Sequence, residues 1–155
     1  MNVAANETDG KRLQTEARVV EKAVRRIVRA HDLQSRALSK RCGLTAAQLI
    51  LMKGIMELGE VTSVALSIYA DISPATVVTI LDNLEERGLI QRYRSGTDRR
   101  IVHTRLTSEG SRLVSEAPEP MGDVFLKNFA GLPPQQRQAL AQAVLQLAEL
   151  MSPAR

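Results

Sequence analysis

The sequence predicts a mainly α-helical protein with a small β-hairpin wing, built as a winged helix-turn-helix with further helices at both ends. Apolar residues recur at steps of three and four along most of the chain, the spacing of helices with one apolar face. A short helix, a tight turn and a capped helix follow one another in residues 61–88, and a strand-turn-strand pattern comes next. A chain of 155 residues fits one domain with a single core.

The first predicted element is a long helix over residues 11–42. Leu13, Val20 and Ile27 repeat at helical spacing, and a glycine follows the last predicted turn. Residues 1–10 are polar and show no periodicity, which is typical of a disordered tail. We therefore expect a tail followed by one domain over residues 11–155.

Residues 45–107 are expected to form the winged helix-turn-helix lobe. The first helix of the lobe starts with a capping-box pattern and ends near Gly59, the second is short and ends at Ala70, and the third runs to Gly88. A proline in the first position of that third helix costs no hydrogen bond. The residues expected to cap these helices and the helix after the wing are Thr45, Thr62 or Ser63, Ser73 and Thr107.

The wing is predicted as a hairpin of two short strands. Leu89–Arg94 and Ile101–Leu106 contain β-branched and aromatic residues and are separated by Ser, Gly, Thr and Asp, a turn composition. No other sheet is expected. The hairpin is strongly cationic and carries Arg92, Arg94, Arg99, Arg100 and Arg105.

Residues 108–151 are predicted to be helical again, with breaks. Pro118 and Pro120 interrupt the first helix after the wing, and a glycine and two prolines precede the last helix. Apolar residues of the last helix again step by four and three, as in helices that pack on one another. Together with residues 11–42, this region is expected to supply a dimer interface, although part of each apolar stripe must also belong to the core.

The charge is unevenly distributed. The chain has a net charge of +4 and a pI near 9.6, which favours a polyanionic partner. Lys11 to Arg41 contains ten basic and three acidic residues, whereas Ser108 to Arg155 contains four basic and five acidic ones. Such a basic run also fits an ordinary solvated helix face. No apolar run approaches the length of a membrane span, so we expect a cytoplasmic protein with no membrane partner.

The helix that follows the tight turn has the features of a DNA-recognition helix. At 100° per residue, Val77, Leu81 and Leu84 share the core face, while Val78 points outward and can meet a thymine methyl group. No Lys or Arg lies between Pro74 and Glu86, so phosphate contacts and the wing must supply most of the affinity. The expected DNA contacts from the helices are Thr62, Ser63, Ser73, Pro74, Ala75, Thr76, Val78, Thr79 and Asn83.

These segments resemble the MarR family of transcriptional regulators. The resemblance is carried by residues 72–90 (ISPATVVTILDNLEERGLI), by Asp98-Arg99-Arg100 and by residues 106–110, and it is close from Thr45 to Gly110. It implies a homodimer with intertwined terminal helices, a pseudopalindromic double-stranded DNA operator and a small effector that releases the DNA. It also implies that Asp98 orients Arg100 into the minor groove, beside Arg94 and Arg99.

Several further hypotheses remain open. His31, Met52 and Met56 are candidate effector-binding residues, although the core is the favoured interpretation for the methionines. Cys42, the single cysteine, excludes an intrachain disulfide and is a candidate redox sensor, or simply a packing residue. No metal site, cofactor or catalytic constellation is recognisable, so we expect a regulator, more often a repressor, and not an enzyme. A winged-helix protein-docking adaptor is the alternative.

Overall fold

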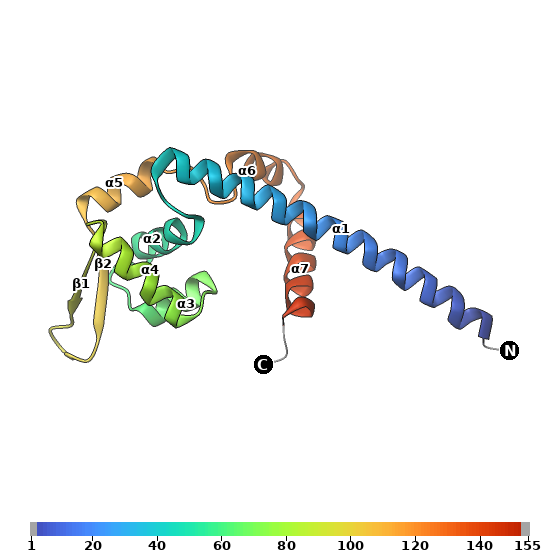
Figure 1. Ribbon diagram of the computed structural model, residues 1–155, viewed down its shortest axis with the longest axis horizontal. Coiled ribbons are helices and arrows are strands. Elements are labelled where there is room, and N and C mark those ends of the chain that lie inside the picture. The colour runs from blue at the N-terminus through green and yellow to red at the C-terminus, as the bar shows by residue number, and fades with distance from the viewer. Residues whose placement is uncertain (1–2, 153–155) are drawn as a thin grey trace. The chain divides into compact units, whose positions relative to one another are not determined.

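The computed structural model describes residues 3–152 and confirms the predicted fold class: helices throughout, interrupted by one antiparallel hairpin (Figure 1). The chain divides into two compact units, Met1–Pro120 and Met121–Arg155. The elements in order are α1 (Val3–Cys42), α2 (Ala46–Leu58), α3 (Ser63–Ala70), α4 (Pro74–Glu86), β1 (Ile90–Arg94), β2 (Val102–Leu106), α5 (Ser108–Glu116), α6 (Asp123–Ala130) and α7 (Pro134–Met151).

The first helix is longer than predicted. α1 begins at Val3 and not at Lys11, so residues 3–10, predicted as a tail, continue the helix. Ala4, Ala5 and Glu7 have high helix propensity, which offsets the missing apolar periodicity of this stretch. Residues 1 and 2 lie outside the described residues.

The predicted helix caps are confirmed. The Oγ1 atoms of Thr45, Thr62 and Thr107 accept hydrogen bonds at 3.1–3.2 Å from backbone N–H groups three residues on, and Ser73 Oγ does the same for Thr76 at 3.2 Å. At Thr45 the capping box is complete, because its own N–H donates to Gln48 Oε1 at 3.0 Å. Each cap satisfies a donor that the helix backbone leaves free, which fixes where α2 to α5 begin.

A tight turn sets the angle of the helix-turn-helix. The axes of α3 and α4 are bent by 111° relative to each other. Asp71 ends α3 in the left-handed conformation (φ 52°), and its N–H donates to Ser67 O. Aspartate tolerates this region better than most side chains, so the turn does not require glycine. The chain then enters α4 at Pro74.

The sheet is the two-stranded hairpin that the sequence predicts. β1 and β2 pair antiparallel with Ile90 opposite Leu106 and Arg94 opposite Val102, within one residue of the predicted strand ends. Val61, between α2 and α3, also forms an antiparallel bridge with Thr104 at the outer side of β2. Within the described residues the hairpin is the only sheet, as predicted, and the bridge is an addition that the sequence did not predict. A single bridged residue has no alternating pattern that would reveal it in a sequence.

The hydrophobic core lies in the lobe. The buried apolar side chains run from Leu38 to Val114, and no residue of α6 or α7 is buried within the described part of the chain. α1 joins this core only near its end, through Leu38 and Cys42. In residues 3–152 no single helix has both the length and the apolar composition that crossing a bilayer requires.

Candidate DNA interface

The outward face of α4 is arranged as the helical wheel predicted. Val77, Leu81 and Leu84 are fully or almost fully buried, whereas Val78 is 42% exposed. Beside it, the Thr79 hydroxyl donates to Ala75 O at 3.1 Å, which leaves the lone pairs of its oxygen free. The Thr79 oxygen can therefore accept a hydrogen bond from a base. In the major groove, the amino groups that could donate it are adenine N6 and cytosine N4.

Two residues at the start of α4 are hydrogen-bonded to each other. Ser73 Oγ caps Thr76 N–H and lies 2.8 Å from Thr76 Oγ1. Ser73, Pro74, Ala75 and Thr76 are all exposed, so this end of the helix is open to a phosphate. Thr62 caps α3 in the same way.

Asn83 is less free than the sequence suggested. Its Oδ1 accepts a hydrogen bond from Gln48 Nε2 at 2.8 Å, and Gln48 Oε1 in turn accepts one from Arg87 at 3.4 Å. The acceptor of Asn83 is thus used inside the protein, and only its amide N–H groups remain for a base or a phosphate. This bond ties α4 to α2, and its partners stand 35 positions apart, beyond any local sequence pattern.

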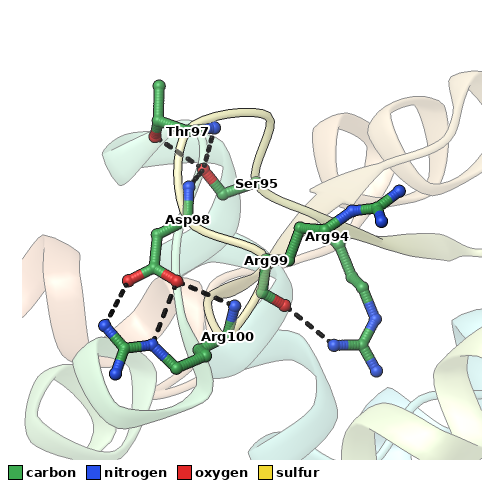
Figure 2. Close-up of polar contacts among 6 residues, drawn as sticks. All are labelled: Arg94, Ser95, Thr97, Asp98, Arg99 and Arg100. Carbon is green, nitrogen blue, oxygen red and sulfur yellow. Dashed lines mark hydrogen bonds and ion pairs between the residues drawn. The ribbon is translucent and has the colours of Figure 1, made fainter.

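The tip of the wing holds one arginine in a fixed orientation (Figure 2). Arg100 donates three hydrogen bonds to the Asp98 carboxylate, from its backbone N–H at 3.0 Å, from Nε at 3.2 Å and from Nη2 at 3.1 Å. The Arg100 hydrogen bonds hold the pKa of Asp98 below its ordinary value. The Arg100 side chain nevertheless remains 91% exposed. The pairing predicted from the resemblance is present, and it leaves the guanidinium accessible to a ligand.

The loop around this pair is also ordered by hydrogen bonds. Ser95 Oγ accepts from the N–H groups of Thr97 and Asp98 at 3.3 and 3.4 Å. Arg94 Nη1 donates to the carbonyl of Arg99 at 2.8 Å (Figure 2). Arg94 therefore supports the loop as well as adding charge, whereas Arg99 is exposed.

Arg92 has a role that the sequence did not reveal. Its guanidinium points back to α4 and bonds Glu85 Oε2 through Nε at 2.8 Å and through Nη2 at 2.6 Å, and Asp82 Oδ1 through Nη2 at 2.6 Å. The hydrogen bonds from Arg92 lower the pKa of Glu85, and those to Glu85 and Asp82 raise the pKa of Arg92. Arg92 thus joins the wing to α4, and its single positive charge offsets one of the two negative charges that would repel phosphate.

We expect Arg92→Ala to lower the free energy of unfolding by about 1 kcal/mol at pH 7, a modest value because the pair is partly solvated. Since the pKa of Glu85 is depressed in the folded protein, the contribution is complete above the ordinary glutamate pKa of about 4.3 and disappears as the pH falls through the depressed value. Urea unfolding at pH 7 and at about pH 3 should show the wild-type advantage shrinking in acid.

Arg112 provides the control for that measurement. It also bonds two carboxylates, Glu109 and Glu116, but all three lie on α5. Arg112→Ala should therefore cost less than Arg92→Ala, in line with exposed pairs inside a helix. Equal losses for the two variants would contradict a fastening role for Arg92.

The effector and redox candidates do not come together into one site. Met52 is completely buried in the core, whereas Met56 on the same helix and His31 on α1 are exposed. The Cys42 thiol donates to Leu38 O at 3.2 Å and packs against the core, as a structural cysteine does. Effector binding by His31, Met52 and Met56 and redox sensing by Cys42 stay predictions.

A shallow cavity lies instead within the predicted interface. Its volume is about 210 Å³, and its walls come from α3, α4 and both strands. The lining residues are Ser63, Val78, Leu81, Arg92, Val102 and Thr104. An exposed second helix in a helix-turn-helix, followed by a hairpin with an accessible arginine at its tip, is the arrangement of a winged helix.

Comparison with known proteins finds a family match over part of the chain. Residues 44–102 match the MarR family model. The chain is 39% identical over 74 residues to YhbI of Bacillus subtilis, an HTH-type transcriptional regulator, and 33% identical over 88 residues to the transcriptional regulator HosA of Escherichia coli O157:H7. The solved structure of Bordetella bronchiseptica BpsR, described with the regulation of its DNA binding by 6-hydroxynicotinic acid, is similar with a TM-score of 0.66 and 26% identity. Residues 44–102 thus match the MarR family, and the likeness to BpsR shows that the fold extends over most of the chain.

The extent of these similarities differs between sequence and structure. The YhbI alignment spans 48% of each chain, and the HosA alignment spans 57% of this chain and 64% of HosA, less than two thirds of either relative. The BpsR likeness covers 83% of this chain and 98% of the other. MarR proteins are DNA-binding regulators and not enzymes, which agrees with the prediction from the sequence.

Proposed function

We propose that this protein is a transcriptional repressor that binds a pseudopalindromic double-stranded DNA operator as a homodimer and is released by a small-molecule effector in the cytoplasm. The observation that carries the proposal is the wing tip, where Asp98 holds Arg100 in one orientation while the guanidinium stays 91% exposed. An arginine presented in this way suits the narrow, electronegative minor groove of A·T-rich DNA.

In the proposed complex, α4 and the wing make different kinds of contact with DNA. α4 enters the major groove and offers Val78 to a thymine methyl group and Thr79 as an acceptor, a contact set with limited base discrimination. The wing and the exposed start of α4 supply charge and phosphate contacts, which position the protein on the duplex. We therefore expect affinity to depend strongly on salt and specificity to depend partly on the shape of A·T-rich DNA.

The dimer is supported by apolar surface that the single chain leaves open. Leu13, Val20 and Ile27 of α1 are 66%, 42% and 54% exposed, although they form one stripe of the helix. One lobe makes too few contacts for a specific affinity of about 10⁻⁸ M or tighter, whereas two linked lobes can reach it. A second copy that covers this stripe would place two recognition helices about 34 Å apart on one face of DNA.

The proposal of a small-molecule effector is supported by the similar protein BpsR and not by a pocket in this structure. DNA binding by BpsR, which shares this fold, is regulated by 6-hydroxynicotinic acid. A small organic ligand would release DNA if it bound more tightly to a dimer whose two lobes are spaced differently from the DNA-bound dimer. The repressor assignment is supported by a likeness of 31% identity over 68 residues to the HTH-type transcriptional repressor MdtR of Bacillus subtilis.

Selection of bound fragments from a genomic DNA pool tests the proposal. We expect enrichment of an inverted repeat with half-sites about one DNA turn apart, and a dimer in solution at working concentrations. A monomer with no preference for any inverted repeat over bulk genomic DNA would overturn the proposal and favour the protein-docking adaptor.

Replacement of Asp98 separates orientation from charge. Asp98→Asn removes one negative charge beside the DNA, so electrostatics alone would tighten binding. Because the carboxylate also holds Arg100, we expect weaker operator binding, by roughly three- to ten-fold, with discrimination against mutated operators reduced. Fluorescence anisotropy on matched operators measures both quantities, and tighter binding would show that Asp98 does not position Arg100.

A further inference from the structure

A second cationic surface runs along α1, separate from the wing. We call it the α1 basic stripe. Its members follow one another at steps of seven and four residues and, at 100° per residue, lie within about 40° of arc on a helix. At 1.5 Å per residue they extend over about 44 Å. All are exposed, and they are Lys11, Arg18, Lys22, Arg29, Arg36 and Lys40.

Among the side chains that the structure describes, none neutralises the charge of the α1 basic stripe by an ion pair. None of its six members forms an ion pair with any side chain that the structure describes. The nearby acids Glu16 and Glu21 pair instead with Arg12 and Arg25, which lie outside the stripe. Six like charges thus share one face of a helix, which is unfavourable unless water, ions or a polyanion screen them.

The opposite face of α1 is apolar. On the same wheel Leu13, Val20 and Ile27 lie about 180° from the centre of the basic stripe. A helix that lies on a membrane buries its apolar face and keeps its cations at the rim of that face, near the lipid headgroups. Here the cations would point directly away from the bilayer. If a second copy covers the apolar face, the stripe remains exposed on the outside.

We propose that the α1 basic stripe binds the phosphate backbone of double-stranded DNA without regard to sequence, in addition to the contacts of α4 and the wing. Neighbouring cations stand about 6–10 Å apart along the helix, close to the Debye length of about 8 Å at physiological salt, so their potentials add. DNA carries one negative charge per about 1.7 Å of its axis and releases counterions to such a row. The proposal requires a DNA-binding protein but does not depend on the operator or on Arg100.

Two matched triple variants of the full-length chain test it. Arg18→Gln with Arg29→Gln and Arg36→Gln removes three charges from the stripe, and Arg12→Gln with Arg26→Gln and Arg41→Gln removes three from the rest of α1. All six side chains are exposed, and glutamine is a good helix former, so both variants should keep the helicity measured by circular dichroism. The two proteins have equal net charge.

The probe is a random-sequence duplex of about 40 base pairs, titrated between about 50 and 200 mM salt. We expect the slope of log Kobs against log salt to fall by up to about 2.7 in the stripe variant, or about 0.9 for each phosphate that is no longer neutralised, and by much less in the control. The same difference should persist when both triple sets are placed in an Arg100→Ala background, where the wing no longer contributes. If the stripe variant lost helicity, Arg29→Gln alone should still lower the slope by about 0.9.

Equal changes in the two triple variants, or no change in either, would overturn the proposal. The proposal would also be overturned if the stripe variant lost binding to phosphatidylglycerol vesicles but kept its binding to DNA. The stripe would then be a lipid-binding surface. Two further binding assays identify which DNA molecule the stripe contacts. An operator with long flanking sequences tests whether the stripe contacts the DNA molecule that already carries the operator. Capture of a labelled duplex by protein bound to an immobilised duplex tests whether the stripe contacts a second DNA molecule. Loss of operator preference in Arg100→Ala, with the stripe effect retained, separates this surface from the operator site.

Discussion

Replacing Arg100 with alanine is expected to weaken operator binding by roughly ten- to hundred-fold and to lower the salt slope by about one unit for each wing. The reason is geometric as well as electrostatic. Two hydrogen bonds from the guanidinium to Asp98 hold the side chain before DNA arrives, so little conformational entropy is lost when it enters the groove. Anisotropy titrations of the selected operator over a salt series measure both effects.

Arg105→Ala is the matched control for Arg100→Ala. Arg105 also belongs to the hairpin, but its guanidinium bonds Gln91 Oε1 at 2.8 and 3.2 Å and lies 5.1 Å from the centre of the Tyr93 ring. The two variants have the same net charge, so an equal loss of affinity would show that Arg100 acts only through long-range charge. Unchanged affinity and salt slope in Arg100→Ala would remove the wing from the interface.

Gly110→Ala is expected to destabilise the protein by about 2–4 kcal/mol. A Cβ atom at this position would lie 2.0 Å from Leu89 O, a backbone atom that cannot move alone. The start of α5 is bonded to the same segment, since Thr107 N–H donates to Leu89 O at 3.1 Å and its hydroxyl to Gly88 O at 2.8 Å. Helix propensity alone predicts the opposite sign, about 1 kcal/mol of stabilisation.

Gly10→Ala shows the effect of propensity without a clash. Gly10 is also inside a helix, and a Cβ atom there would meet nothing within 4 Å. Thermal and urea unfolding of the two variants should therefore move in opposite directions. A stabilised Gly110→Ala protein would mean that α5 does not pack against Leu89 as the structure has it.

The local features of the fold were predictable from the sequence, because their causes lie within a few residues. The Thr45, Thr62, Ser73 and Thr107 caps each join a side chain to a backbone group three positions away. The outward direction of Val78 follows from helical periodicity alone. The Asp98 and Arg100 pair spans two residues and matches a family pattern. Residue spacing is sufficient information for the caps and for Val78, whereas the Asp98 and Arg100 pair was predicted from the resemblance.

The missing features depend on how separate elements meet. The Asn83 bond to Gln48 and the Val61 bridge to Thr104 join distant residues, so no local pattern contains them. Arg92 and Glu85 are seven positions apart, but their contact requires the chain to reverse between α4 and β1. The early start of α1 was missed for another reason: helix propensity without apolar periodicity gives a weak signal.

The attachment of Arg92 to Glu85 and Asp82 has a consequence for operator release. In the proposed complex, α4 in the major groove and Arg100 in the minor groove belong to one lobe in which Arg92 joins the hairpin to α4, so both elements are expected to leave their grooves together. A ligand that tilts the lobe by a small amount must misplace both at once. Dissociation should then be all-or-none within each half-site, with a sharper dose response than two loosely joined elements would give.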